Sequence, residues 1–279
     1  MVLEIIKLLR VKQWYKNIII YISILFSFNL FNGNLLFSTT LGFISLCLIS
    51  SSYYIINDII DLEKDKNHPE KKNRPLASGK IKPPTALIIS FLLFNISLII
   101  AYSLSIRFLI SILLLYLLSQ AYTFFIKKIA FLDIITISTN FVIRAISGTF
   151  IINEPVSWWV ILCTFFLSIF LVSAKRSLEL NYKKYREGYL DSDTEVLNLL
   201  STLSITSVFI FFSIYSILTN KPLLLISLPI ALYIISNFLR KSKTEPEKIR
   251  NPEKFILSKE NLIALIIWFI VIITTFYLF

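Results

Sequence analysis

The chain has 279 residues, of which 56% are hydrophobic and only 16% are charged. A water-soluble core cannot absorb so much apolar surface, so the composition predicts a membrane protein and excludes a soluble globular domain. The formal net charge of +11 is divided among separate segments rather than gathered on one soluble face, which argues against nucleic-acid binding.

Apolar runs of about twenty residues recur along the chain, and a helix needs this length to cross roughly 30 Å of hydrocarbon. Residues 1–17 are basic and partly amphipathic, so they predict a short helix on the membrane surface and no cleavable signal peptide. About nine transmembrane helices then follow, at residues 18–31, 37–56, 84–104, 108–126, 132–152, 157–173, 197–218, 222–239 and 261–279. The predicted fold is an all-α polytopic membrane helix bundle that forms a single domain over residues 1–279.

The basic residues predict how the chain is threaded through the membrane. Of the 28 Lys and Arg residues, 25 lie on one side of the predicted bundle, in residues 1–17, at Lys127 and Lys128, and in the long loops 57–83, 174–196 and 240–260. Lys and Arg accumulate on the cytoplasmic side, so this side and the N-terminus are predicted to be cytoplasmic. Arg107 and Lys221 fall on the opposite side, and Arg144 lies inside the fifth run.

Two of the long loops are placed similarly in the sequence. Loops 57–83 and 174–196 follow the second and sixth predicted spans, and this spacing indicates two related halves. In that arrangement the two cytoplasmic loops would cap a shared central cavity.

Residue counts exclude some metal and nucleophile chemistries. His68 is the only histidine, which excludes a histidine-rich zinc site and a histidine-based catalytic triad. Cys47 and Cys163 fall inside different apolar runs, so they are predicted to be buried packing residues rather than a disulfide or a zinc pair.

The end of the second predicted span carries the strongest chemical signal. If that helix continues, Asp58, Asp61 and Asp65 lie on one face at i, i+3 and i+7, and Asn57 joins a neighbouring stripe at i, i+4 and i+8. Like charges at these spacings repel one another unless a cation lies among them. A few carboxylates hold Mg²⁺ when water and phosphate oxygens complete its coordination, so a magnesium site with a phosphate ester is predicted. The alternative is a solvated acidic helix end without a ligand.

Several basic residues are candidates for binding phosphate. Lys71 and Arg74 follow the acidic residues in a turn that contains prolines, where they could pair with diphosphate oxygens. Arg144 is the most informative cation, because an arginine inside an apolar span is costly and normally faces a polar cavity or a partner. Its alternative role is an internal ion pair, with Asp133 as the candidate partner.

The acidic motif N-D-x-x-D-x-x-x-D at 57–65 is followed by H-P-x-K-x-x-R-P-x-x-S-G at 68–79. This pattern resembles the first acidic motif of the UbiA-type intramembrane prenyltransferase superfamily. Further segments resemble the decaprenyl-phosphate phosphoribosyltransferase branch over nearly the full length: R-V-K-Q-W-Y-K-N at 10–17, A-Y-T-F-F-I-K at 121–127, R-A-I-S-G at 144–148, A-K-R-S-L-E-L at 174–180 and N-P-E-K-F-I-L at 251–257.

The resemblance implies an enzyme of the plasma membrane whose active site faces the cytoplasm. It would transfer 5-phosphoribose from 5-phosphoribosyl 1-diphosphate to a decaprenyl-like polyprenyl phosphate and release diphosphate, and its product would serve cell-wall biogenesis. Asp58 and Asp61 would be catalytic, and Mg²⁺ would be held by Asn57, Asp58, Asp61 and Asp65. The implied substrate-binding residues are Lys16, Asn17, Lys71, Arg74, Tyr122, Lys127, Arg144, Lys175, Arg176 and Glu179.

Two alternatives remain open at this point. A prenyltransferase of the same superfamily would use the same site to transfer a prenyl group to an aromatic or glycerol-phosphate acceptor. Those enzymes usually carry a second D-x-x-x-D motif after the sixth span, whereas this chain has only Asp191 and Asp193, at a different spacing. A transporter or scaffold with the same bundle is the other alternative. The oligomeric state cannot be inferred from the residues.

Overall fold

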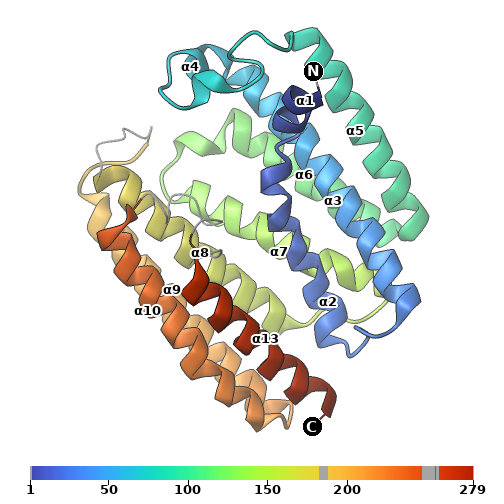
Figure 1. The fold of residues 1–279 in the computed structure, drawn as a ribbon, viewed down its shortest axis with the longest axis vertical. Coiled ribbons are helices and arrows are strands. Elements are labelled where there is room, and N and C mark those ends of the chain that lie inside the picture. The colour runs from blue at the N-terminus through green and yellow to red at the C-terminus, as the bar shows by residue number, and fades with distance from the viewer. Residues whose placement is uncertain (1, 182–187, 247–254, 256–257, 279) are drawn as a thin grey trace. The chain divides into compact units, whose positions relative to one another are not determined.

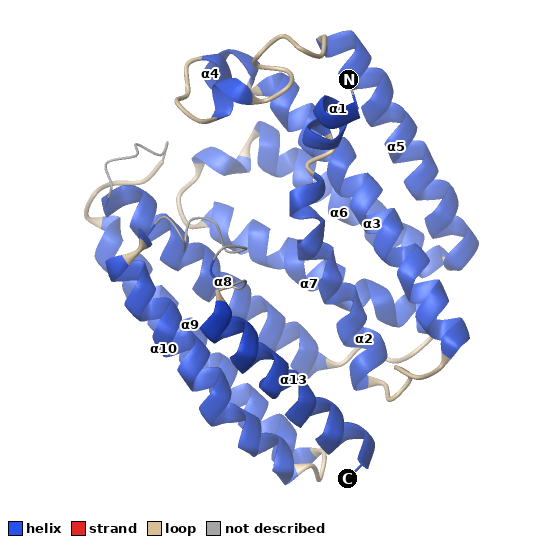
Figure 2. Cartoon of the chain, in the orientation of Figure 1, coloured by secondary structure: helices blue, strands red, loops and turns tan. Residues whose placement is uncertain are grey.

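The computed structural model describes residues 2–181, 188–246, 255 and 258–278. Over this part of the chain Figure 2 shows helices and loops only, which confirms the all-α prediction. The helices labelled in Figure 1, with the short η (3₁₀) helices between them, are α1 (Val2–Leu8), η1 (Val11–Ile20), α2 (Tyr21–Phe26), α3 (Gly33–Ile60), α4 (Leu62–Lys66), η2 (Lys71–Asn73), α5 (Pro83–Leu104), α6 (Ile106–Phe124), η3 (Ile126–Lys128), α7 (Leu132–Ile152), α8 (Trp158–Asn181), α9 (Asp193–Leu218), η4 (Pro222–Ile226), α10 (Ser227–Thr244) and α13 (Lys259–Leu278).

Within the described residues, eight helices are long and apolar enough to cross a membrane. They are Gly33–Ile60, Pro83–Leu104, Ile106–Phe124, Leu132–Ile152, Trp158–Asn181, Asp193–Leu218, Pro222–Thr244 and Lys259–Tyr277. These helices coincide with eight of the nine predicted spans, so the chain is a multi-pass membrane protein.

The first predicted span, residues 18–31, is wrong as a continuous α-helix. The chain instead forms the ten-residue 3₁₀ helix η1 and then the six-residue α2, which ends at Phe26. A 3₁₀ helix rises about 2.0 Å per residue and an α-helix about 1.5 Å, so the two together extend roughly 29 Å. This length is close to the roughly 30 Å of the hydrocarbon core. In Figure 1 the segment runs alongside α3, which it contacts.

The chain divides into two compact units. The first comprises Met1–Lys127 and Asn140–Val156, and the second comprises Lys128–Thr139 and Ser157–Phe279. The first turns of α7 therefore belong to the second unit, and the rest of this helix belongs to the first.

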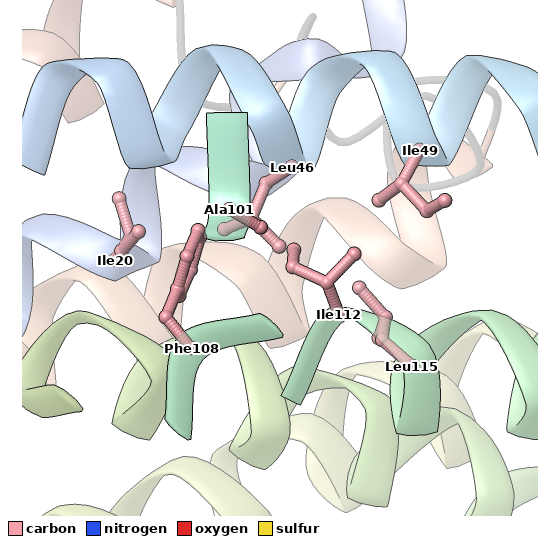
Figure 3. Packing of buried hydrophobic residues seen from close by; sticks show 7 residues of the cluster. All are labelled: Ile20, Leu46, Ile49, Ala101, Phe108, Ile112 and Leu115. Carbon is pink, nitrogen blue, oxygen red and sulfur yellow. The ribbon is translucent and has the colours of Figure 1, made fainter. Parts of the chain in front are cut away.

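The core of the first unit lies between η1, α3, α5 and α6. Figure 3 shows its fully buried side chains directed into the space between these helices: Ile20, Leu46, Ile49, Ala101, Phe108, Ile112 and Leu115. Aliphatic and aromatic side chains from four elements interdigitate there, so α3 packs against η1, α5 and α6.

Two reciprocal serine pairs hold α3 against α5. The hydroxyls of Ser45 and Ser97 each donate to the other residue's carbonyl oxygen, at 3.0 and 2.9 Å. Ser52 and Ser90 repeat the arrangement at 3.0 Å in both directions. From the first pair to the second the residue number rises in α3 and falls in α5, so the two helices are antiparallel. Each interhelical hydrogen bond in a membrane is worth about 0.6 kcal/mol, but together they fix the register of α3, whose last turns carry the acidic motif.

The second unit is built from two packed helix pairs, α8 with α9 and α10 with α13. Phe170 of α8 packs against Phe238 of α10, with ring centroids 5.1 Å apart, and Phe238 packs against Phe255 at 5.3 Å. Apart from Phe255, the segment 251–257 lies outside the described residues, as do residues 182–187 of the predicted second loop.

Candidate active site

The sequence predicts that the acidic motif lies on one uninterrupted helix, but the structure breaks that helix within the motif. Helix α3 ends at Ile60, Asp61 occupies the junction with φ −87° and ψ 8°, and α4 begins at Leu62. Asp58 and Asp65 are 3% and 2% exposed, whereas Asp61 is only half-buried. The interruption therefore separates Asp61 from the other two carboxylates.

Asp58 and Asp65 are joined by one arginine. Arg74 Nη1 donates to Asp58 Oδ1 at 2.8 Å and to Asp65 Oδ2 at 2.5 Å. Arg10 also donates to both carboxylate oxygens of Asp58, with Nε 3.3 Å from Oδ2. Lys71 Nζ lies 3.7 Å from Asp65 Oδ1. Two buried acids are thus surrounded by three cations, which removes the repulsion expected between like charges.

Asp61 has a different partner. Lys127 Nζ donates to Asp61 Oδ1 at 2.7 Å, and the two residues are 66 positions apart in the sequence. Both side chains are 19% exposed. Lys127 and Asp61 therefore form an ion pair beside, and separate from, the pair of carboxylates that share Arg74. We call the seven residues Arg10, Asp58, Asp61, Asp65, Lys71, Arg74 and Lys127 the charged network.

The charged network fits a divalent cation in one place. Within the described residues, no three His, Cys, Asp or Glu side chains are gathered so as to hold a metal ion. Asp58 and Asp65, however, lie on either side of a single cationic nitrogen of Arg74. Mg²⁺ is commonly bound by one or two carboxylates with phosphate and water as its other ligands, so this pair of donors fits it if Arg74 moves aside. The half-buried Asn57 adjoins Asp58, and the four-residue magnesium site stays a prediction.

Arg144 lies in α7 with 5% of its surface exposed. Its Nη2 donates to the hydroxyl of Tyr53 at 2.6 Å. The alternative of an ion pair between Arg144 and Asp133 is wrong, because the two residues lie on the same helix, roughly 16 Å apart along its axis, and Asp133 pairs with Arg176 instead. Asn17, another predicted substrate ligand, is 1% exposed and belongs to the same first unit.

A second cluster of charges lies in the second unit. Asp133 is fully buried, and it accepts from Arg176 Nε at 2.9 Å and from the hydroxyl of Tyr189 at 2.5 Å. Arg176 Nη1 donates to Glu179 at 2.9 Å, and the Phe131 amide donates to the Tyr189 oxygen at 2.9 Å. Burial, followed by the hydrogen bond to Asp133, raises the pKa of Tyr189. This cluster ties the start of α7 to the end of α8.

The remaining predicted ligands have varied surroundings. Lys16, Tyr122 and Lys175 are half-buried, and each has an interaction partner in the protein. A groove of about 520 Å³, lined by Glu4, Ile5, Lys80, Ile81, Lys82, Thr85 and Ile89, shares no residue with the charged network.

Three residues that the structure places in these clusters were absent from the predicted site. Arg10 begins the R-V-K-Q-W-Y-K-N segment, so the sequence did carry a signal for it. Tyr53 could have been noticed because a buried tyrosine hydroxyl usually needs a hydrogen-bond partner. Tyr189 follows Gly188, which has a φ of +90°, and the sequence offered no signal that it would reach Asp133.

Comparisons with known proteins show the family and the fold. Residues 18–258 match the model of the UbiA prenyltransferase family. The chain is 31% identical to a decaprenyl-phosphate phosphoribosyltransferase of Mycolicibacterium smegmatis over 221 residues, which are 76% of this chain and 70% of that protein. It is 30% identical to the Mycobacterium tuberculosis protein of the same name over 231 residues, 77% and 74% of the two chains. A solved UbiA homologue from Archaeoglobus fulgidus, bound to GPP and Mg²⁺, has the same fold, with a TM-score of 0.70 at 20% identity over 96% of this chain and 99% of that one.

Proposed function

Because the chain belongs to the UbiA prenyltransferase family, we propose that it transfers 5-phosphoribose from 5-phosphoribosyl 1-diphosphate to a polyprenyl phosphate and releases diphosphate. The observation that carries this proposal is the identity of about 30% to two decaprenyl-phosphate phosphoribosyltransferases over about three quarters of the chain. The charged network supports it, since buried carboxylates interleaved with arginines and lysines suit a metal-bound diphosphate.

The proposed reaction needs no general base. An oxygen of the acceptor phosphate attacks C1 of the ribose, the bond from C1 to the diphosphate oxygen breaks, and its electron pair leaves with diphosphate. A phosphate monoester has a second pKa of about 6, so the attacking oxygen is already ionised near neutral pH. A reaction that needs no general base agrees with a chain that has a single histidine.

The charged network would bind the donor's diphosphate. Asp58 and Asp65 would hold Mg²⁺, with Asn57 and Asp61 as the further predicted ligands. When bound, Mg²⁺ would neutralise negative charge on the diphosphate as it departs. Arg74, freed from the two carboxylates, would donate to diphosphate oxygens in the planar arrangement that guanidinium groups favour.

Other residues are proposed to complete substrate binding. Arg10, Lys71 and Lys127 would add positive charge beside the diphosphate, because charge that develops on a leaving group is stabilised by cations already in place. The other predicted substrate ligands remain proposals: Lys16, Asn17, Tyr122 and Arg144 in the first unit, and Lys175, Arg176 and Glu179 in the second.

The proposal includes a location and a topology. The basic residues of the loops favour an active site that faces the cytoplasm, in the plasma membrane, with the whole chain acting as one transferase domain. The acceptor's polyprenyl chain would explain why the enzyme is embedded in a membrane.

Prenyl transfer to an aromatic or glycerol-phosphate acceptor is the second candidate, and the likeness in fold to a homologue bound to GPP favours it. The residues after α8 argue against it. Asp193 caps a turn, where its Oδ2 accepts from the Leu190 amide at 2.9 Å, and Asp191 is exposed. Two acids at this spacing do not form the second D-x-x-x-D motif that such enzymes usually carry.

The purified protein can test both candidates. It is incubated with radiolabelled 5-phosphoribosyl 1-diphosphate and decaprenyl phosphate, or with labelled geranylgeranyl diphosphate and an aromatic acceptor, each with Mg²⁺ or EDTA. We expect magnesium-dependent label in the lipid phase from the first donor, and a product mass that corresponds to added phosphoribose. Label from the prenyl donor alone would refute the proposal.

A matched pair of variants tests the site. Asp58→Asn should lower the transfer rate by at least about 100-fold, since it removes a carboxylate from a diphosphate-metal site. Glu63→Gln is the control, because Glu63 lies in the adjoining helix α4, where its side chain is 80% exposed and pairs only with Lys66 among the described residues. Equal activity of Asp58→Asn and Glu63→Gln would remove Asp58 from the site.

A further inference from the structure

Arg144 is a buried cation that forms no ion pair with any described residue. It lies within the apolar helix α7 and is 5% exposed. Its hydrogen bond goes to a neutral phenol, Tyr53, and its guanidinium carbon lies 5.3 Å from the centre of the Phe141 ring. Within the described part of the chain, no carboxylate forms an ion pair with it, and its Nε has no hydrogen-bond partner. A buried guanidinium in this condition needs a ligand that accepts hydrogen bonds and carries negative charge.

Neutral polar side chains prepare the space beside Arg144. The Tyr53 hydroxyl donates to Ser50 Oγ at 3.2 Å, and Ser50 in turn lies 3.5 Å from Asn17 Oδ1. Asn17 Nδ2 donates to the thiol sulfur of Cys47 at 3.4 Å. These residues come from η1 and α3 and are all buried. They fix Tyr53, which orients the guanidinium, but they supply no negative charge.

Asn140 lies one helical turn before Arg144, on the same face of α7. Its Oδ1 is buried and has no hydrogen-bond partner among the described residues. Two neighbouring side chains on one face therefore have unmet hydrogen-bonding capacity, and one of them is a cation. The unpaired cation excludes a metal ion as the missing ligand and favours an oxyanion. The amide of Asn140 would have to turn so that its Nδ2, rather than its Oδ1, faces that oxyanion and donates to it.

The position of Tyr53 along α3 gives the depth of its partner Arg144 and indicates which kind of anion reaches it. Its partner Tyr53 precedes Asp58 by five residues on one continuous helix, so it lies roughly 7.5 Å deeper in the apolar span. The charged network holds the diphosphate under the proposed function. A second phosphate site, deeper in the apolar span than the first, is reached most readily by a molecule that already lies in the bilayer.

We propose that Arg144 and Tyr53 bind a phosphate monoester, and that this is the phosphate of the acceptor lipid rather than the 5-phosphate of the donor. The identification of the lipid rests on the proposed function. It assigns the two phosphate groups to two depths: diphosphate at Asp58 and Arg74, acceptor phosphate at Arg144. The attacking oxygen would then approach C1 from the side opposite the leaving group.

Binding measurements separate the two sources of phosphate. The purified full-length protein is titrated with decaprenyl phosphate, with the neutral alcohol decaprenol, and with 5-phosphoribosyl 1-diphosphate, each alone, and thermal stabilisation is recorded. Arg144→Met should raise the Kd for decaprenyl phosphate at least about tenfold, because a charge-assisted hydrogen bond is lost. The response to decaprenol and to the soluble donor should stay as in the wild type. Arg107→Met is the matched control, since Arg107 is exposed at the start of α6.

The unliganded variant gives a second readout. Methionine removes an unpaired buried charge, so Arg144→Met should unfold at the wild-type temperature or above it. A purely structural arginine would instead leave a less stable protein with unchanged lipid affinity, which would overturn the proposal. Tyr53→Phe keeps the charge and removes the orienting hydroxyl, and it should weaken decaprenyl phosphate several-fold if Arg144→Met fails to fold.

Two further outcomes are decisive. Loss of the response to the soluble donor, with lipid binding retained, would assign Arg144 to the ribose phosphate and overturn the lipid assignment. Wild-type protein that binds decaprenyl phosphate through Arg144 but transfers no phosphoribose would refute the proposed function and leave this site standing.

Discussion

Replacing Arg74 tests whether its guanidinium occupies the place of a metal ion. Arg74→Met removes two hydrogen bonds to carboxylates, at 2.8 Å to Asp58 and 2.5 Å to Asp65. Hydrogen bonds to charged groups contribute about 1.5–3 kcal/mol each, and the 26% exposure of Arg74 favours the lower end, so we expect a loss of about 3 kcal/mol. Asp58 retains Arg10, whereas Asp65 retains only Lys71, at 3.7 Å, among its described partners.

The assay is thermal unfolding of the purified variant in EDTA and in increasing Mg²⁺. A loss of 1 kcal/mol lowers the melting temperature by about 2–4 °C in a domain of 150–250 residues, so Arg74→Met should melt about 6–12 °C below the wild type in EDTA. Mg²⁺ at 100 times its Kd would return about 2.7 kcal/mol, because it binds between the carboxylates that have lost their cation. Arg107→Met should melt as the wild type does. Equal responses of Arg74→Met and the wild type to Mg²⁺ would refute the reasoning.

Three further substitutions have expected outcomes. In Gly148→Ala the new methyl group would lie 2.6 Å from the carbonyl oxygen of Ile20, so the melting temperature should fall by the equivalent of about 1–3 kcal/mol. Tyr189→Phe should lower the free energy of unfolding, measured with denaturant, by about 1.5–3 kcal/mol, since Asp133 loses a hydrogen bond. The pKa of Tyr189 is raised above 10, so the wild type should be more stable than the variant below pH 10 and should lose this difference as the pH rises further. Hydrogen bonds from two lysines lower the pKa of Glu4 below 4.5, so the ionised Glu4 stabilises the wild type above pH 4.5 and this stabilisation is lost in acid. Glu4→Gln should remove it, and melting temperatures measured across that pH range check the prediction.

The helices were predictable because they depend on short-range sequence patterns. A run such as 84–104 is long and apolar enough to require a helix in a bilayer, and the structure has α5 at Pro83–Leu104. The same reasoning failed at residues 18–31, since hydropathy reports depth in the membrane but does not distinguish a 3₁₀ helix from an α-helix. About eight residues of 3₁₀ helix extend as far along the axis as about eleven residues of α-helix.

The partners of the acidic motif were not predictable, because they are distant in sequence. Arg10 is 48 residues before Asp58, and Lys127 is 66 residues after Asp61. Spacing within the motif correctly keeps Asp58 and Asp65 together, seven residues apart. It cannot show that Asp61 has a separate partner, since that depends on the junction between α3 and α4 and on a lysine from η3.

The charged network as it stands is suited to an exchange of partners. Its three carboxylates face four cations, so the buried acids are neutralised before any substrate arrives. Mg²⁺ alone would displace Arg74 and leave a guanidinium unpaired, and diphosphate alone would take the arginine and leave Asp58 and Asp65 facing each other. When both arrive together, the metal takes the carboxylates and the diphosphate takes the guanidinium, so no charge is left without a partner. Magnesium should therefore stabilise wild-type protein little until diphosphate is added, and a strong response to Mg²⁺ alone in the same titration would argue that Arg74 moves without cost.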